Sequence, residues 1–297
     1  MSGAVWTPVV ILGAGRSGTN ILRDCLVGLP GFATWDCDEI NPVWRVGQAR
    51  RSDDEFSPAD LTPTARRVIG HAFARIATRD PGTRFVVEKT CANSLRPGFV
   101  DEALDGARFI QIVRDGRDVV PSAMKRWRGE LEVDGRSYFI AKARNTPLRE
   151  LPYYLWQFAV RRLGMLLGRS ERLSRWGPLY RGLEDDANVP LSLICARQWA
   201  KSVERTNDYL ATLPAERWYC LAYEDFVADP AGELRKVVQF LGAKVSDDQL
   251  ASAVGTVRTK KGGSGKGLDL LDAAEREPAL ATMQPQLERY RYLRNAV

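Results

Sequence analysis

Residues 8–20, Pro-Val-Val-Ile-Leu-Gly-Ala-Gly-Arg-Ser-Gly-Thr-Asn, carry the strongest structural signal in this chain. The first five are apolar and mostly β-branched, which predicts a buried strand, and apolar residues within 21–26 recur at helical spacing. Between such a strand and helix, backbone N–H groups and the positive helix N-terminus bind phosphate. The alternative is a tight turn without a ligand. We predict an anion-binding loop made of Gly15, Arg16, Ser17, Gly18, Thr19 and Asn20.

This loop has the glycine spacing of a P-loop but lacks the rest of that motif. A Walker A sequence continues with Lys, which reaches the outer phosphates, and with Ser or Thr, which holds magnesium. Thr19 and Asn20 occupy those two positions, and Arg16 supplies a cation from within the loop instead. We therefore expect a phosphate-like anion bound without a metal, which argues against ATPases and kinases.

Strand and helix patterns alternate along most of the chain, which predicts an α/β fold of the P-loop type with three layers, a parallel sheet flanked by helices. The expected strands are residues 8–12, 83–87, 109–113 and 218–223. Residues 128–188, rich in Arg and aromatic residues, interrupt the alternation. We interpret them as a helical, substrate-binding insertion over the active-site edge of a single domain, 1–297, although such aromatic residues can also be ordinary core.

The composition narrows the classes of protein further. The 297 residues carry 43 Lys and Arg against 37 Asp and Glu, a formal charge of +6, and 44% are hydrophobic. Disorder, collagen and disulfide-rich miniproteins are excluded. No run reaches 18 apolar residues and residues 1–6 do not resemble a signal peptide, so we expect no membrane span. Five cysteines without a CxxC pair favour free thiols, no metal site and a cytoplasmic location.

The chain has one histidine, His71. Residues 64–78 have the pattern of an amphipathic helix, with His71, Arg67 and Arg75 on its polar face. Hydrolases with a catalytic Ser-His-Asp or Cys-His set and multi-histidine metal sites need histidine in the site. We therefore expect another group to serve as any general base.

A second anion-binding motif is predicted after the strand at 109–113. Arg114 ends that strand, where open α/β sheets bind ligands, and Ser122 follows eight residues later in the first turn of the next helix. A guanidinium and a helix-start hydroxyl can hold one phosphate together. Two anion sites on one sheet suggest a ligand with phosphates at both ends. The alternative is a structural salt bridge between Arg114 and Asp118.

Three segments together resemble a known family: Arg-Ser-Gly-Thr-Asn at 16–20, Val-Arg-Asp-Gly-Arg-Asp-Val-Val-Pro-Ser at 113–122, and Tyr-Glu-Asp-Phe at 223–226 with Asp229-Pro230. They look like sulfotransferases that use 3′-phosphoadenosine-5′-phosphosulfate (PAPS) and release adenosine 3′,5′-bisphosphate (PAP). The resemblance implies that the first loop holds the 5′-phosphosulfate. It implies that Arg114 and Ser122 hold the 3′-phosphate and that Tyr223 approaches the adenine.

The details are most similar to the tyrosylprotein sulfotransferase branch and its bacterial relatives. Cytosolic sulfotransferases usually have Lys in the first loop and a catalytic His, whereas this chain has Arg16 and no usable His. Asp38-Glu39 corresponds to that branch's Glu-Glu pair, which implies Glu39 as the catalytic base. Arg16 and Lys89 would stabilise the transferred sulfuryl group. Lys260 and Lys261 partly match a basic nucleotide-binding loop of the cytosolic family.

The sequence therefore predicts metal-independent transfer of a sulfuryl group from PAPS to a hydroxyl or amine. The acceptor, a phenol, glycan, lipid or peptide, stays open, and we expect no nucleic-acid partner. Trp35 and Ile40 would shield Glu39 and raise its pKa, unless Asp36, Asp38 and Glu39 pair with Arg45 or Arg50 at the surface. The alternatives are a nucleotide or small-molecule kinase and a non-catalytic module that binds nucleotides or polyanions.

Overall fold

The computed structural model describes residues 6–129, 147, 156, 176–186, 188–257 and 265–292. These residues form a five-stranded sheet in the order β2-β3-β1-β4-β5, in which every neighbouring pair is parallel. The strands are β1 (Thr7–Leu12), β2 (Phe32–Ala33), β3 (Phe85–Lys89), β4 (Arg108–Val113) and β5 (Trp218–Ala222).

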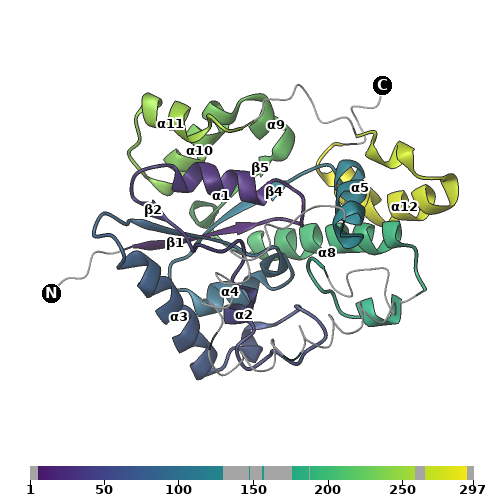
Figure 1. The fold of residues 1–297 in the computed structure, drawn as a ribbon, viewed down its shortest axis with the longest axis horizontal. Helices are drawn as coiled ribbons and strands as arrows, with labels where there is room; N and C mark the ends of the chain where they lie inside the picture. Colours follow the sequence, from purple (N-terminus) through teal and green to yellow (C-terminus); the bar gives the residue numbers. More distant parts are fainter. Residues whose placement is uncertain are drawn as a thin grey trace.

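Helices cover both faces of this sheet (Figure 1). One face carries α1 (Thr19–Val27), α9 (Tyr223–Ala228), α10 (Pro230–Leu241) and α11 (Asp247–Ala253). The other carries α2 (Asn41–Trp44), α3 (Pro63–Ala77), α4 (Pro97–Ala103) and the C-terminal part of α8 (Leu191–Leu210), and α5 (Gly116–Trp127) and α12 (Ala273–Arg289) pack against α8 beside the sheet. Short 3₁₀ helices span Pro58–Asp60, Cys91–Leu95, Leu183–Asp186, Ala215–Arg217 and Gly267–Leu270. The predicted α/β fold with a parallel sheet between two helical layers is confirmed.

The central strand β1 shows why the two layers form. Its side chains alternate between the faces of the sheet, as in any strand. Val9 and Ile11 enter the core under α1 and α10, whereas Val10 and Leu12 enter the core under α3 and α4, and all four are fully buried. A strand buried on both faces reads as a continuous apolar run, which is how it appears in the sequence.

A third core holds the end of β4 in place. Val113 packs there with apolar residues of α5, α8 and α12, including Val120 and Trp199. The indole Nε1 of Trp199 donates a hydrogen bond to the backbone oxygen of Arg114 at 3.0 Å. The residue that follows β4 is therefore fixed by packing and by a hydrogen bond, which positions its side chain at the edge of the sheet.

The boundaries of two predicted strands are wrong. The strand expected at 83–87 is Phe85–Lys89, because the N–H groups of Arg84 and Phe85 both donate to Gly31 before the strand begins. Tyr223, expected to end the last strand, is the first residue of α9.

Two further expectations concern the surface and the insertion. His71 is exposed on α3, as predicted. Most of the insertion predicted at 128–188 lies outside the described residues, which there comprise only 128–129, 147, 156, 176–186 and 188. Among the described helices, none is long and apolar enough to cross a membrane.

Candidate active site

A pocket of about 560 Å³ lies at the carboxyl ends of β1, β3 and β4. The adjacent strands β1 and β4 lead in opposite directions there, β1 to β2 on one side and β4 to β5 on the other, and ligands bind at such a point in open α/β sheets. Of the predicted site residues, those that line it are Gly15, Arg16, Gly18, Thr19, Asn20, Glu39, Lys89, Arg114 and Tyr223. Ser17 and Ser122 lie outside the lining, and Lys260 and Lys261 lie outside the described residues.

The loop between β1 and α1 takes a backbone shape that only a few residues favour. Gly18, which precedes the first residue of α1, has φ +90°, and a Cβ there would lie 2.4 Å from the ring of Tyr223. Both its left-handed conformation and the closeness of the Tyr223 ring therefore require glycine. Ser17 is 1% exposed, and its hydroxyl has no hydrogen-bond partner among the described residues.

Arg16 joins the two predicted anion motifs. It has φ +74°, which is unusual for a residue with a side chain. Its Nε donates to the hydroxyl of Ser122 at 3.0 Å, and its backbone oxygen accepts from Arg114 at 3.1 Å. Burial and the nearby guanidiniums of Arg126 and Arg114 lower the pKa of Arg16. This end of the pocket thus gathers like charges, which an anionic ligand would neutralise.

The second motif differs from its expected form in one respect. Asp115 caps α5 by accepting from the N–H of Arg117 at 2.9 Å, so α5 begins at Gly116 and Ser122 lies in the second turn. The expected helix-start hydroxyl is therefore wrong, and in this structure Ser122 binds Arg16. The guanidinium of Arg114 lies 4.6 Å from the centre of the Tyr223 ring, a cation–π contact.

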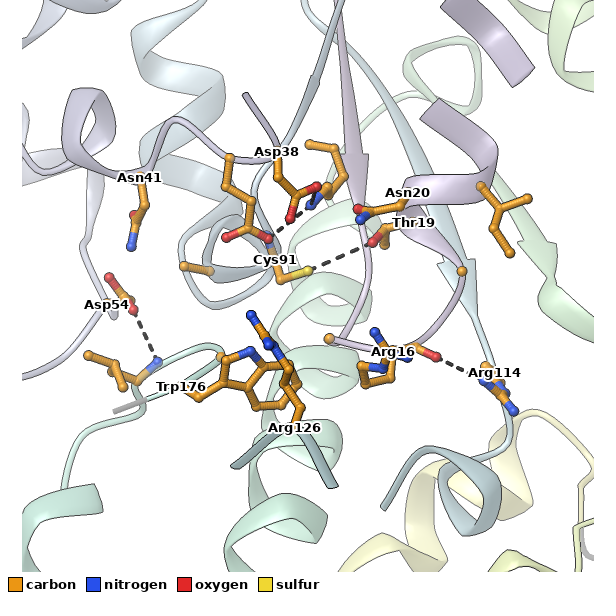
Figure 2. A pocket seen from close by; sticks show the side chains of 18 of the residues that line it. Arg16, Thr19, Asn20, Asp38, Asn41, Asp54, Cys91, Arg114, Arg126 and Trp176 are labelled. Atoms are coloured by element: carbon orange, nitrogen blue, oxygen red, sulfur yellow. Dashed lines mark hydrogen bonds and ion pairs between the residues drawn. The ribbon is translucent and has the colours of Figure 1, made fainter. Parts of the chain in front are cut away.

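Lys89 forms the centre of an ion cluster at the other end. It is 3% exposed, and its Nζ lies 3.0 Å from both Asp38 Oδ1 and Glu39 Oε1. The N–H of Cys91 also donates to Glu39 Oε1 at 3.2 Å, and Arg23 binds Asp38 at 2.9 Å. Asp38 and Glu39 therefore line the pocket and bind Lys89 rather than pairing with Arg45 or Arg50 at the surface, whereas Asp36 is exposed and lies outside the lining. Figure 2 shows Asp38 and Cys91 near the centre of the pocket, with Arg16 and Arg114 on one side.

The expected rise in the pKa of Glu39 is wrong. Burial, the largest single influence, would raise this pKa, and Trp35 and Ile40 are indeed buried, but the charge and hydrogen bond of Lys89 together with the N–H of Cys91 outweigh burial and lower it. The pKa of Asp38 is lowered as well, where Lys89 and Arg23 outweigh burial. The carboxylates Glu39 and Asp38 raise the pKa of Lys89 despite its burial. Glu39 is therefore a carboxylate at neutral pH, and Lys89 is an ammonium.

The wall opposite the acids comes from the predicted insertion, although none of its residues was singled out as a site residue from the sequence. Residues 176–179, which we call the wall segment, contribute Trp176, Gly177 and Leu179 to the pocket. Gln198 donates to the backbone oxygens of Trp176 and Pro178 at 2.8 and 2.9 Å, and Asp54 Oδ2 accepts from the N–H of Leu179 at 3.0 Å. The ring of Trp176 packs against the loop between β1 and α1, and a Cβ added to Gly15 would lie 3.1 Å from this ring.

Arg126 also lines the pocket and was missed (Figure 2). It follows Ser122 by four residues, so both lie on one face of α5. This four-residue spacing could have identified Arg126 as a pocket residue from the sequence. The wall segment, in contrast, has no local pattern that links it to residues more than a hundred positions earlier in the chain.

The pocket and the sheet define an α/β protein that gathers cations and a glycine loop at the carboxyl edge of its strands, as proteins that bind phosphate-bearing ligands do. A model of the Sulfotransferase family matches residues 8–163 and 172–247. The chain belongs to this family and is a sulfotransferase, as the sequence motifs predicted. The kinase and the non-catalytic module are thereby set aside.

Two solved structures of sulfotransferases share the fold. A sulfotransferase from Alicyclobacillus acidocaldarius is 18% identical at a TM-score of 0.50, with 97% of this chain and 95% of that chain covered. Mouse sulfotransferase SULT7A1, solved as a complex with PAP, is 14% identical at a TM-score of 0.50, with 99% and 92% covered. At such identities the likeness shows the fold alone. No curated protein sequence matches the chain.

Proposed function

We propose that this sulfotransferase moves a sulfuryl group from PAPS to an acceptor hydroxyl or amine, with Glu39 as the base and without a metal ion. The observation that carries the proposal is the pairing, within one pocket, of an anion-binding end with a buried lysine–carboxylate end. PAPS, when bound, supplies the sulfuryl group and presents phosphates at both ends. The residues present fit such a ligand, because the repulsion among Arg16, Arg114 and Arg126 is relieved by an anion.

The nucleotide end would hold the two phosphate groups in separate places. The loop at Gly15, Arg16, Gly18, Thr19 and Asn20 would bind the 5′ group through backbone N–H groups at the start of α1. Arg114 would bind the 3′-phosphate with Ser122 beside it, and Tyr223 would contact the adenine. The hydrogen bonds that join Arg16 to Ser122 and to Arg114 hold both places at a fixed separation before the ligand arrives.

The lysine end would carry the chemistry. Glu39 is ionised, so it can accept the proton of the acceptor hydroxyl as the acceptor oxygen bonds to sulfur. Lys89 remains protonated and would stabilise the charge that grows on the sulfuryl oxygens and on the bridging oxygen as the old S–O bond breaks. Asp38 and Cys91 hold these two groups in position, which limits the reorganisation needed during transfer.

Lys260 and Lys261 would reach the 3′ end of the nucleotide. Both lie outside the described residues, but the described chain resumes beside the second anion motif. The N–H groups of Gly265 and Gly267 each donate to the carboxylate of Asp118 at 3.1 Å. Since Asp118 lies between Arg114 and Ser122 in the sequence, this anchor supports a nucleotide contact for the basic residues that precede Gly265.

The location and the domain organisation are proposed on simpler grounds. All five cysteines are free, and Cys25, Cys37, Cys91 and Cys195 are buried, which suits a reducing, cytoplasmic compartment. The family model matches residues on both sides of the predicted insertion and most of the insertion itself, which favours one domain.

A thermal-shift comparison tests the proposed nucleotide. PAP should raise the melting temperature by several degrees, because it binds only the folded protein, whereas ATP with Mg²⁺ should change it little. Transfer of label from ³⁵S-labelled PAPS to small hydroxyl acceptors then tests the reaction. Equal shifts with both nucleotides, or no shift with PAP, would contradict the assignment of PAPS.

A further inference from the structure

Asn41 holds a hydrogen-bond donor in the pocket that the proposed mechanism does not use. It is the first residue of α2, two residues after Glu39, and it lines the pocket. Its Oδ1 accepts from Arg96 at 2.5 Å. Because a guanidinium can only donate, the amide oxygen must face Arg96 and the Nδ2 group must face away from it. Among the described residues, none accepts a hydrogen bond from this Nδ2.

The orientation of Asn41 is fixed by a rigid partner. Arg96 is 1% exposed, its Nε donates to Asn93 Oδ1 at 2.9 Å, and its second terminal nitrogen donates to Asp54 Oδ1 at 3.2 Å. Its guanidinium also lies 5.0 Å from the centre of the Phe56 ring. A buried cation with these contacts cannot turn without leaving charges unpaired, which is costly in the interior. The amide of Asn41 is therefore held in one orientation, with its Nδ2 group turned away from Arg96.

The donor faces a space bounded by the wall segment. Asp54, fully buried, binds Arg96 through one carboxylate oxygen and the N–H of Leu179 through the other. Asn41 and Leu179 are thus fixed from one side chain, and Figure 2 shows Asn41 and Asp54 on one side of the pocket with Trp176 nearby and Arg16 and Arg114 on the far side. This is the part of the pocket that the proposed nucleotide site leaves for the acceptor.

We propose that Asn41 selects acceptors that carry a second oxygen on the carbon next to the one bearing the sulfated hydroxyl. This inference rests on the proposed function. Glu39 and Asn41 are separated by one residue and line the same pocket, so an acceptor whose hydroxyl faces Glu39 can place a neighbouring oxygen at Asn41. The substrate class is therefore a vicinally oxygenated ring, such as a sugar or a 1,2-dioxygenated phenol. A site built to donate to a substrate oxygen rejects the analogue without it.

A matched pair of acceptors tests the proposal: 2-methoxyphenol, whose ether oxygen can only accept, and 2-ethylphenol, which has the same shape without that oxygen. A second pair, trans-2-methoxycyclohexanol and trans-2-ethylcyclohexanol, covers non-aromatic rings. Transfer from ³⁵S-labelled PAPS is measured as kcat/KM for each, and binding of PAP is measured separately by calorimetry. In the unaltered enzyme the methoxy compound of at least one pair should be preferred roughly tenfold.

Asn41→Asp is the informative variant, because it keeps an oxygen for Arg96 and replaces only the donor. The ratio of kcat/KM for the methoxy compound to kcat/KM for the ethyl compound should fall to one or below, while the affinity for PAP stays unchanged. The ratio between two acceptors cancels any effect of the added charge on transfer itself. Asn188→Asp, on an exposed turn, is the control and should keep the preference.

The outcomes separate this inference from the proposed function. Binding of PAP with sulfation of the methoxy and ethyl compounds at equal rates leaves the function standing and overturns the role of Asn41. The role is also overturned if the preference survives in Asn41→Asp, or if the enzyme binds PAP but sulfates neither methoxy compound. Absence of PAP binding overturns both.

Discussion

At the Arg16 end of the pocket the charged side chains repel one another, whereas at the Lys89 end they attract. Burial together with Arg126 and Arg114 lowers the pKa of Arg16. Lys89, in contrast, lies 3.0 Å from each of two carboxylates, and its pKa is raised. Like charges gather at one end, whereas at the other end the Lys89 ammonium lies between two carboxylates.

The two ends of the pocket differ in the interactions that hold their side chains in place. The nucleotide end is held by bonds to neutral groups, such as Arg16 to Ser122, and keeps its positive charge for a ligand. The lysine end uses its charges on one another, which fixes the reacting groups but lowers the basicity of Glu39. Substitutions at the first end should therefore change affinity, and substitutions at the second should change turnover.

Glu39→Gln should have the largest effect. It keeps the size of the side chain and its ability to accept from Cys91, but it cannot take a proton, so turnover should fall roughly 10²–10⁴-fold. Steady-state kinetics with saturating acceptor and calorimetry with PAP check this, and PAP affinity should be nearly unchanged. Because the pKa of Glu39 is lowered, the unaltered enzyme should lose activity only as pH falls below the ordinary glutamate range.

Asp36→Asn and Asp38→Asn are the matched controls for that experiment. Asp38 holds Lys89, so its variant should reduce turnover less than Glu39→Gln does. Near-normal turnover in Glu39→Gln, together with loss in either control, would assign the base to the other acid. If Glu39→Gln lost as much PAP affinity as turnover, the two ends of the pocket would not have separate roles.

Arg114→Ala should have the next largest effect, now on binding. The loss of a charge-assisted contact, worth about 1.5–3 kcal/mol, should weaken PAP roughly 10- to 150-fold. Adenosine 5′-phosphate, which lacks the 3′ group, should be affected much less. Calorimetry with both nucleotides measures the difference, and Arg79→Ala, at an exposed position after α3, serves as the control. Equal weakening of both nucleotides would place Arg114 elsewhere than at the 3′-phosphate.

Glu88→Gln tests the buried surroundings of Lys89 through stability. Burial raises the pKa of Glu88 from 4.5 to about 7, although Thr90 donates to it. Between these pH values the folded state holds more protons than the unfolded state, so the free energy of unfolding falls as pH rises through this window. The variant should abolish that contribution, which amounts to at most about 3 kcal/mol.

Denaturant titrations at pH 5, 6, 7 and 8 measure the dependence for both proteins. Glu277→Gln, at an exposed position of α12, should leave the dependence of the unaltered protein in place. An identical pH profile for Glu88→Gln and the unaltered protein would show that Glu88 titrates near its ordinary pKa in the folded state.

The smallest expected effect is that of a chelator. Thr19 and Asn20 stand where a P-loop places its lysine and its magnesium-binding hydroxyl. Activity should therefore be unchanged by EDTA in a direct rate measurement. Loss of activity that Mg²⁺ restores would mean that the nucleotide end needs a metal to neutralise its ligand, rather than the cations of Arg16 and Arg114.

Much of the fold could be predicted because its signals are local. The strand–loop–helix at residues 8–27 and the strand before Arg114 each lie within a short window. The two-residue strand β2 has no detectable period, and α9 follows β5 without any turn residue between them. Two consecutive polar residues, Glu88 and Lys89, indicate that the strand has ended. Both are nevertheless buried in β3, because each has a hydrogen-bond partner there.

The site was predictable where its residues follow strands and was missed where contacts join distant segments. Lys89 and Arg114 stand at strand ends, so their meeting follows from the topology. The bonds from Asp54 to Leu179 and from Arg96 to Asn41 connect residues 125 and 55 positions apart, which no local pattern reports. The direction of the pKa shift of Glu39 was mistaken for the same reason, because it depends on where Lys89 lies.

Gln198 forms hydrogen bonds with residues on both sides of the segment 128–175. Its Oε1 accepts from the indole of Trp127 at 3.1 Å, and its Nε2 donates to the backbone of Trp176 and Pro178. One side chain therefore ties the end of α5 to the wall segment of the pocket, so a change at position 198 reaches the helix that carries Ser122 and Arg126 and the opposite wall at once.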